Sequence, residues 1–473
     1  MSLLRFRKPI NATPPRRAGN RKLMGKARRC WRGHGADMGH SGEDVAAGAI
    51  PPQGVAGSPE RNAKVGPQAE LVRSAFLIGA GVFATTLAQP AVIKLPLQNL
   101  LKTDLHVASE GMAFFFAVAA LAWYFKPLAG ILSDSFPLFG TRRRHYLLFS
   151  AATAAILWLV VAVVPRSYGS LLWAVVAMNA MLVMGSTVVG GLLVEAGQRY
   201  GATGRLTSAR YFVMNMCLLL GGPLGGFLAA RSFGLSAAVC GTIAFSVVPV
   251  AILLLHESPT AERRSEVWTN AWAHIKTLVR SGTLWSAAGL LFLVYISPGF
   301  GTPLYYYQTD TLKFSQQFIG NLGFISGVLG LLGAVVYGLL CRRLSLRPLL
   351  ALGIVCSVIS TLFYLFYRST TAALFIEGGA GLFATLAEVP LMDLAARATP
   401  RGSESLGFAV MMSVRNGALA LSDIVGSLLI DQYHVSFFSL VWLNAGTTAV
   451  VLLVIPFLPR VLMNRRDGEA AAP

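Results

Sequence analysis

Twelve stretches of about 20 or more mostly apolar residues follow one another along the chain, separated by shorter polar segments. A helix of about 20 apolar residues spans the hydrocarbon core of a bilayer, and it bonds its own backbone, as lipid requires. The pattern therefore predicts twelve membrane-spanning helices. They are expected at residues 72–101, 109–133, 146–165, 169–195, 205–230, 234–255, 284–309, 317–341, 347–367, 371–396, 404–430 and 434–458.

The longest polar break between these stretches, residues 256–282, divides them six and six. Trp268 and Trp272 lie one helical turn apart in it, so we predict that part of the break is an amphipathic helix on the membrane surface. The predicted organisation is an all-α membrane protein with two pseudo-symmetric six-helix bundles. Its parts are a basic disordered tail (1–70), a first bundle (71–256), a linker (257–283), a second bundle (284–459) and a C-terminal tail (460–473).

Composition agrees with a membrane protein, because 54% of the residues are hydrophobic, 13% are charged, and the mean hydropathy is +0.59. The net charge of +19 is explained by topology. Of the 40 Lys and Arg residues, 14 lie in residues 1–73, 14 in loops on the same predicted side, 3 after the last helix and only 5 in the opposite loops. The positive-inside rule then predicts that both termini are cytoplasmic, and nucleic-acid binding is not needed to explain the charge.

The first 70 residues are rich in Arg, Gly and Pro and contain no apolar run, so we predict a disordered cytoplasmic tail that touches anionic lipid. The five cysteines are scattered without a CxxC spacing and are interpreted as small packing residues. We therefore expect no disulfide, metal or other cofactor. These cysteines are Cys30, Cys217, Cys240, Cys341 and Cys356.

The two halves of the chain resemble one another at polar, glycine and proline landmarks. Aligning AQPAVIKLP (88–96) with ISPGFGTPL (296–304) places Pro90 over Pro298. Two further alignments place Glu195 and Arg199 over Asp393 and Arg397, and Asn215 and Gly225 over Asn416 and Gly426. Chance similarity among apolar helices is the alternative, but corresponding helices carry the matches. Duplication predicts a site between the halves, near the membrane midplane.

One strip, KPLAGILSDSFPLFGTRRRHY (126–146), concentrates charge at the end of the second predicted helix. Together with LPLQNLLKTDLHVASEGM (95–112) and YYYQTDTLKFSQQFIG (305–320), it resembles the folate-biopterin transporter family of the major facilitator superfamily. The resemblance covers about residues 72–460 and leaves out the N-terminal tail. It implies the major facilitator fold and alternating-access transport of a folate, a pterin or a similar organic anion.

The same resemblance assigns interdomain gating at the cytoplasmic side to Asp134 and the arginines after it. Positive-inside anchoring alone would explain the arginines but not the aspartate. The equivalent loop of the second half, CRRLSLRP (341–348), keeps arginines and has no acid, so the predicted gate is asymmetric. The predicted gating residues are Lys126, Asp134, Arg142, Arg143, Arg144, Glu195 and Asp393.

Ionisable residues inside spans indicate a substrate path, because a charge in hydrocarbon is costly unless it faces a cavity or a partner. Glu377 and Glu388 lie three helical turns apart on one face, about 16 Å along the axis. Arg415 and Asn416 are expected at the depth of Glu388, which predicts a pair between Glu388 and Arg415. The predicted substrate-binding residues are Lys94, Glu377, Glu388, Arg415 and Asn416.

Each of these charges has a structural alternative. Glu388 and Arg415 can be a purely structural ion pair, whereas Lys94 and Asp423 near the outer face, and Lys126 and Arg210 near the inner face, can snorkel to the membrane surface.

The chemistry of the predicted site suits a pterin or folate. A carboxylate, Glu377 or Glu388, can accept the N3-H and 2-amino donor edge of a pterin, and Arg415 or Lys94 can bind a folate's glutamate tail. A buried carboxylate can carry a coupling proton, and no GxxxxGK[ST] motif supports ATP drive.

Two other interpretations stay open: a facilitator of another amphipathic solute, and a non-transporting membrane assembly factor of the same fold. An enzyme is not expected, since HExxH and GxSxG are absent. We expect the bacterial inner (plasma) membrane as the location.

Overall fold

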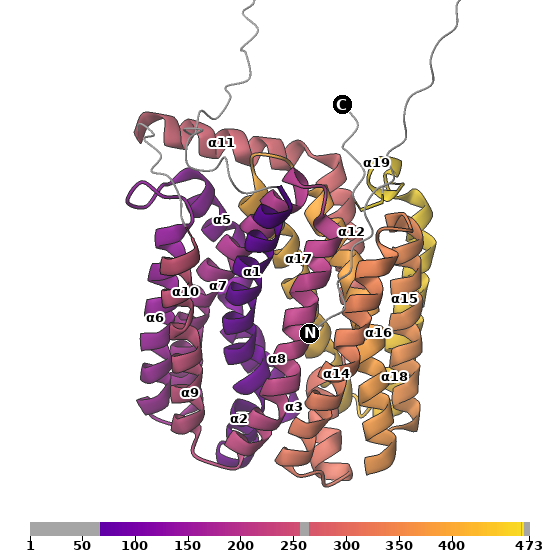
Figure 1. The fold of residues 1–473 in the computed structure, drawn as a ribbon. Helices are drawn as coiled ribbons and strands as arrows, with labels where there is room; N and C mark the ends of the chain where they lie inside the picture. The colour runs from indigo at the N-terminus through magenta and orange to yellow at the C-terminus, as the bar shows by residue number, and fades with distance from the viewer. Residues whose placement is uncertain (1–66, 256–263, 465, 468–473) are drawn as a thin grey trace, which may run out of the picture. The chain divides into compact units, whose positions relative to one another are not determined.

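The computed structural model describes residues 67–255, 264–464 and 466–467 (Figure 1). The predicted basic tail therefore lies outside the described residues up to residue 66, as do Cys30 and residues 256–263 of the predicted linker. All twelve predicted spans are helical, and we number them one to twelve below.

The first half contains spans one to six. Span one is α1 (Pro67–Thr86) with the π-helix η1 (Leu87–Val92), α2 (Lys94–Asn99) and the π-helix η2 (Leu100–Asp104). Span two is α3 (Ser109–Ala119), α4 (Leu121–Tyr124) and α5 (Lys126–Ser135). Spans three to six are α6 (Arg144–Val163), α7 (Tyr168–Arg199), α8 (Thr203–Ala229), and α9 (Phe233–Phe245) with α10 (Val247–Leu254).

The second half follows α11 (Arg264–Arg280). Span seven is α12 (Gly282–Tyr295), α13 (Gly301–Tyr306) and the π-helix η3 (Tyr307–Thr311). Spans eight to eleven are α14 (Gln316–Leu340), α15 (Leu346–Phe363) with the 3-10 helix η4 (Tyr364–Phe366), α16 (Thr370–Ala398) and α17 (Glu404–Asp431). Span twelve is α18 (Phe437–Val450) with the 3-10 helix η5 (Val451–Phe457), and the short α19 (Arg460–Met463) follows it.

Ten helices among the described residues are long and apolar enough to cross a membrane, or eleven if the bent pair Trp272–Arg280 and Gly282–Tyr295 is one span. The predicted spans 109–133 and 284–309 fall short of continuous helices because they are interrupted. Pro127 stands at the start of α5, and Pro298 lies between α12 and α13. Proline has no N–H to donate and clashes with the preceding turn, so the breaks at α5 and before α13 have a local cause. Twelve crossings remain consistent with this arrangement.

Spans one and seven share an unusual backbone. Gln89, next to Pro90, leaves helical geometry at φ −148 and ψ 122, and the corresponding Pro298 lies in the break before α13. Each span then ends in a π-helix that is followed by a residue with positive φ, His106 at 51 and Lys313 at 57. Because side chains other than glycine rarely adopt this conformation, its recurrence at equivalent points supports the predicted duplication.

Two glycines that the repeat alignment pairs lie against these broken spans. A Cβ on Gly225 would lie 2.8 Å from the Val92 carbonyl oxygen, and one on Gly426 would collide with the Gly299 carbonyl oxygen. Helices therefore approach the broken backbone closely in both halves, and only glycine leaves room for it.

The halves contact each other mainly through α8 with α14 and through α5 with α17. Figure 1 shows α8 and α14 side by side along their length. Glycines line this contact: a Cβ on Gly222 would lie 2.5 Å from the Gly320 carbonyl oxygen, and one on Gly327 would lie 2.5 Å from the Leu219 nitrogen. Small residues bring the backbones together, as in other membrane helix pairs.

The linker helix α11 makes a 68° bend with α12 and crosses the ends of the helices in Figure 1. His274 on α11 shares a 2.7 Å hydrogen bond with Ser403, and Trp272 is exposed. The predicted linker helix is therefore present, its place at the membrane surface stays a prediction, and the Trp268 side chain lies outside the described part of the chain. The four described cysteines are free and buried.

Candidate functional site

A polar cluster lies between the halves around Glu388 on α16. Its carboxylate accepts hydrogen bonds from Arg415 Nη2 at 3.0 and 3.1 Å, from the Tyr211 hydroxyl at 2.9 Å and from the Tyr295 hydroxyl at 2.8 Å. The guanidinium of Arg415 also lies over the Tyr295 ring, 4.8 Å from its centroid. The predicted pair of Glu388 with Arg415 is thus confirmed, and two tyrosines from different halves complete its shell.

Two further cations lie within Coulombic range of Arg415: Lys126 on α5 and Arg210 on α8. Lys126 is 2% exposed, so the alternative that it snorkels to the surface is wrong; it donates to the Ser186 hydroxyl at 2.9 Å. The Nε atoms of Arg210 and Arg415 are buried and have no hydrogen-bond partner within the described part of the chain. Two guanidinium groups therefore face the carboxylate of Glu388, with Lys126 near them. Such an arrangement attracts an anion because buried charge needs a counter-charge.

A second cluster surrounds Glu377, three turns nearer the start of α16 than Glu388 and about 16 Å away along the axis. The Tyr367 hydroxyl donates to Glu377 Oε1 at 3.2 Å, and Tyr364 lies near the same carboxylate. Lys94 lies within Coulombic range of Glu377. Unlike Glu388, Glu377 forms no salt bridge with any described residue.

The walls of this second cluster are aromatic. The rings of Tyr364 and Tyr367 are stacked with centroids 5.4 Å apart, and Phe300 meets Tyr364 edge-on at 5.1 Å. Flat heterocycles stack on such rings, and the carboxylate beside them offers a hydrogen-bond acceptor.

Two other polar residues of α17 have different surroundings. Asn416 Oδ1 lies 3.4 Å from Arg415 Nη1 and belongs to the first cluster. Asp423 instead accepts from the Thr302 backbone N–H at 2.9 Å and from its hydroxyl at 2.5 Å, so it caps α13 beyond the break in span seven. Asp423 therefore neither snorkels nor takes part in either cluster.

The strip after span two contacts the other half at the start of α17. Asp134 Oδ2 accepts from the Leu406 backbone N–H at 2.9 Å, and Arg143 Nη1 donates to the Ser405 hydroxyl at 2.6 Å. Arg143 Nη2 lies 3.1 Å from Glu195 Oε2 and 3.9 Å from Asp134 Oδ1. A carboxylate at a helix N-terminus is stabilised by the free N–H groups and the helix dipole.

A cavity of about 400 Å³ opens beside this contact. Its lining residues are Asp134, Arg142, Arg143, Leu192, Glu195, Leu255, Gly402 and Glu404. The structure thus brings four of the predicted gating residues together at one site, with Arg144 at the start of α6 next to them.

The remaining two predicted gating residues lie elsewhere. Lys126 belongs to the interior cluster described above, about 12 Å along its helix from Asp134. Asp393 is fully buried and accepts from the Tyr337 hydroxyl at 2.8 Å and from two nitrogens of Arg397 at 2.8 Å. It therefore belongs to a separate cluster that borders the first turn of α8, where a Cβ on Gly204 would lie 3.1 Å from Asp393 Oδ2.

The opposite end of the interface is also joined. Lys102 in η2 contacts Thr309 and Asp310 of η3, and Tyr306 donates to the Val107 carbonyl. The Glu110 backbone N–H donates to Asp431 at 2.7 Å. Contacts between the halves therefore lie at both ends, with the two polar clusters between them.

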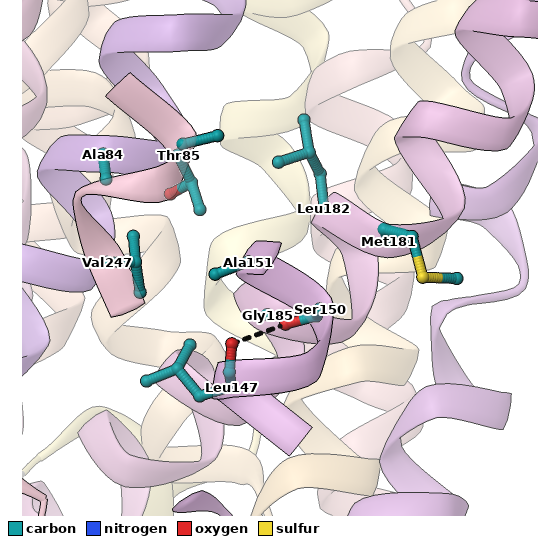
Figure 2. Close-up of a pocket in the computed structure, with 10 residues that line it drawn as sticks. Ala84, Thr85, Leu147, Ser150, Ala151, Met181, Leu182, Gly185 and Val247 are labelled. Carbon is teal, nitrogen blue, oxygen red and sulfur yellow. Dashed lines mark hydrogen bonds between the residues drawn. The ribbon is translucent and has the colours of Figure 1, made fainter. Parts of the chain in front are cut away.

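A small apolar cavity lies away from both clusters, inside the first bundle (Figure 2). Its volume is about 20 Å³, and its walls include Ala84, Leu147, Ala151 and Val247, with Ser150 bonded to the Leu147 carbonyl. This space suits a single water at most and has no charged wall, so it is a packing defect and not a substrate site.

Sequence reasoning missed the tyrosines of both clusters. Tyrosine in an apolar helix is counted with the hydrophobic residues, so Tyr211, Tyr295, Tyr364 and Tyr367 gave no polar signal. One sequence feature could have drawn attention to Tyr211, because it directly follows Arg210, a charge within a span.

Comparison with solved structures gives the class of protein. The human organic anion transporter MFSD10 (TETRAN) matches 81% of this chain and 99% of its own with a TM-score of 0.59 at 17% identity. The proton:xylose symporter XylE matches 86% of this chain and 98% of its own with a TM-score of 0.62 at 14% identity. At these identities the likeness concerns the fold: this is a multi-pass integral membrane protein with the major facilitator fold.

Sequence comparison gives the family. The model described as BT1 family matches residues 89–470. Among similar proteins, the folate-biopterin transporter of Synechocystis sp. is 28% identical over 391 residues, which cover 77% of each chain. Folate transporter 2 of Plasmodium falciparum is 24% identical over 413 residues, or 81% of this chain and 87% of that protein. The chain belongs to the BT1 family, and it is a transporter, not an enzyme.

Proposed function

We propose that the protein is a secondary active transporter that moves a folate, a pterin or a similar organic anion by alternating access, coupled to protons. The observation that carries the proposal is the interior cluster in which the guanidinium groups of Arg210 and Arg415, with Lys126 near them, face the carboxylate of Glu388. Such an excess of positive charge inside a membrane protein calls for an anionic ligand. The named relatives, which are folate-biopterin and folate transporters, support this substrate class.

The two clusters suit the two ends of a folate. Glu388 already accepts bonds from an arginine and two tyrosines, so we assign the pterin's donor edge to Glu377, with Tyr364 and Tyr367 as stacking partners. The substrate's carboxylates go to Lys126, Arg210 and Arg415, whose charges remain in excess. Lys94 beside Glu377 and Asn416 beside Arg415 are proposed as further binding residues.

We assign the coupling proton to Glu377. Glu388 is held by Arg415, whereas among the described residues Glu377 accepts a hydrogen bond from the Tyr367 phenol and lies near Lys94. A carboxyl group that alternates between a proton and a substrate bond couples the two movements, since both compete for the same oxygens.

The gate is assigned to Asp134, Arg142, Arg143, Arg144 and Glu195. Their contacts with the start of α17 would have to break for that end of the protein to open. We place this end at the cytoplasmic side of a bacterial inner membrane, together with both termini, because the basic loops lie there. Residues 71–256 and 284–459 are then the two moving bundles, joined by the linker 257–283, and basic segments contact membrane lipid.

Half-ligands test the two-ended site directly. Thermal unfolding of the purified protein is measured with folic acid, with pterin alone and with p-aminobenzoylglutamate alone. Wild type should be stabilised by all three compounds. Glu377→Gln should lose the response to pterin and keep that to p-aminobenzoylglutamate, and Arg210→Gln should show the reverse, because each change removes one end of the site.

The exposed Arg166→Gln substitution serves as a charge-matched control and should leave every response unchanged. If unrelated organic anions stabilise the wild type and none of the three compounds does, the protein transports another substrate. Absence of stabilisation by any solute, in folded protein, would favour a non-transporting role.

A further inference from the structure

Asp467, after the last span, links the two halves. Its carboxylate accepts from the Gly204 backbone N–H at 2.9 Å and from Arg205 Nε at 2.7 Å, both in the first turn of α8. Its backbone N–H donates to the Cys341 carbonyl at 3.0 Å, at the end of α14. The Asp467 side chain has no exposed surface. One residue of the C-terminal segment therefore joins a helix of the first half to a helix of the second.

This contact resembles that of Asp134, with the bonded N–H one residue nearer the helix start. Asp134, at the end of span two, bonds a free N–H in the first turn of α17; Asp467, held at the end of span eight, bonds a free N–H in the first turn of α8. The repeat relates span two to span eight and α17 to α8. The alignment of VMNMCLLLGGPLGGFL (213–228) with VRNGALALSDIVGSLL (414–429) places the first helical residue Thr203 over Glu404.

The second half needs an acid from elsewhere at this point. The stretch YGLLCRRLSLRP (337–348), which ends α14 and leads into α15, contains no Asp or Glu. Asp467 lies where such an acid would be, because a Cβ on Gly204 would be 3.1 Å from Cys341 Sγ and 3.2 Å from Asp467 Oδ1, with Asp393 Oδ2 also at 3.1 Å.

We propose that Asp467 completes the gate: it is the second half's counterpart of Asp134, supplied by the C-terminal segment instead of by the loop after span eight. The gate then consists of two pseudo-symmetric latches, one on each side of the interface between the halves. Opening this end requires both carboxylates to leave their helix N-termini.

The charges around Asp467 suit a contact that breaks in each transport cycle. Burial raises the pKa of the Asp467 carboxyl, the Arg205 hydrogen bond opposes this rise, and Asp393 nearby acts in the same direction as burial. Arg397 faces Asp393, and Cys341 and Tyr337 complete the surroundings. The closed latch thus carries a desolvation cost that offsets part of its bonds, so opening is not prohibitive.

The test measures opening without substrate, so its failure is distinct from a failure of the proposed substrate. A single reporter cysteine replaces Ser208, which is buried and donates to the Ala334 carbonyl of α14 at 2.6 Å. The native cysteines are replaced, and reaction with a polar maleimide is followed in purified protein. Loss of a charge-assisted bond predicts that Asp467→Ala raises the labelling rate about tenfold. Asp134→Ala should do the same, and Glu469→Gln, which changes the next acidic residue, should not.

A rescue variant separates a latch from general destabilisation. Cys341→Asp in the Asp467→Ala protein places a carboxylate on α14 beside Gly204, and it should return labelling to near the starting rate. If Asp467→Ala does not fold, Asp467→Asn, which keeps an oxygen for the Gly204 N–H, should give a smaller increase. Labelling that rises with Asp134→Ala but stays unchanged with Asp467→Ala would overturn the proposal, as would a failure of Cys341→Asp to rescue.

Discussion

Gly130 in α5 allows this helix to approach the start of α17 closely enough for Asp134 to bond the Leu406 N–H. We predict that Gly130→Ala prevents this contact from closing. The added Cβ would lie 2.7 Å from Leu406 Cα and 3.0 Å from its nitrogen, both backbone atoms that no rotamer change can move. Ordinary carbon contacts need about 3.5 to 4.0 Å, so α17 must retreat by about 1 Å. The bond from Leu406 N–H to Asp134, now 2.9 Å, would then lengthen to about 3.9 Å and be lost.

The expected magnitude follows from that bond. A hydrogen bond to a charged group contributes about 1.5 to 3 kcal/mol, so the closed population should fall about 10- to 150-fold relative to the open one. The assay is maleimide labelling of the Ser208→Cys reporter, with uptake measured on the same variant. Labelling should rise and transport should fall, while the thermal stability changes little.

Gly417→Ala is the matched control, because a Cβ at Gly417 on α17 meets nothing within 4 Å. It should leave labelling and transport as in wild type. Normal transport with unchanged labelling in Gly130→Ala would refute the argument that this close approach holds the gate.

Three further predictions concern the interior charges and the topology. Glu388→Gln and Arg415→Gln should each destabilise the protein by about 3 to 5 kcal/mol in thermal unfolding, since each leaves buried charge unpaired, and each should abolish uptake. Replacing both by leucine should restore much of the stability but not uptake; full uptake would make the pair purely structural. Glu377→Gln should lose accumulation driven by a proton gradient yet retain exchange of substrate across the membrane. Unchanged accumulation in this variant would show that Glu377 does not carry the coupling proton. Tags at residues 61, 263 and 465 should all be accessible only from the cytoplasm, and an external signal from any of them would overturn the topology.

The spans could be predicted because the length of an apolar run is a local property that lipid makes decisive. The Glu388 and Arg415 pair could be predicted for a related reason, since depth in the membrane follows from position along a helix. The interruptions of spans two and seven were less predictable. Pro127 and Pro298 mark them, but neighbouring elements decide how the freed backbone groups are satisfied: Ser422 donates to the Ser297 carbonyl, and Gly299 N–H donates to Ser422.

Long-range contacts set the limit of the sequence reasoning. Lys126 lies within the charged strip, and we therefore predicted that it belongs to the gate. Helix packing instead buries it near Arg210 and Arg415. We predicted an asymmetric gate because the loop after span eight contains arginines but no acidic residue. Asp467 lies about 120 residues further along the chain, and nothing local to it indicates that it contacts α8.

Uptake by proteoliposomes tests the central claim most directly. Vesicles containing the purified protein receive labelled folate, with an inward proton gradient imposed or collapsed, and labelled xylose and an unrelated organic anion serve as comparisons. We predict accumulation of folate above its external concentration only when the gradient is present, and loss of that accumulation in Arg210→Gln. Folate uptake no faster than in protein-free vesicles, with or without the gradient, would contradict the account.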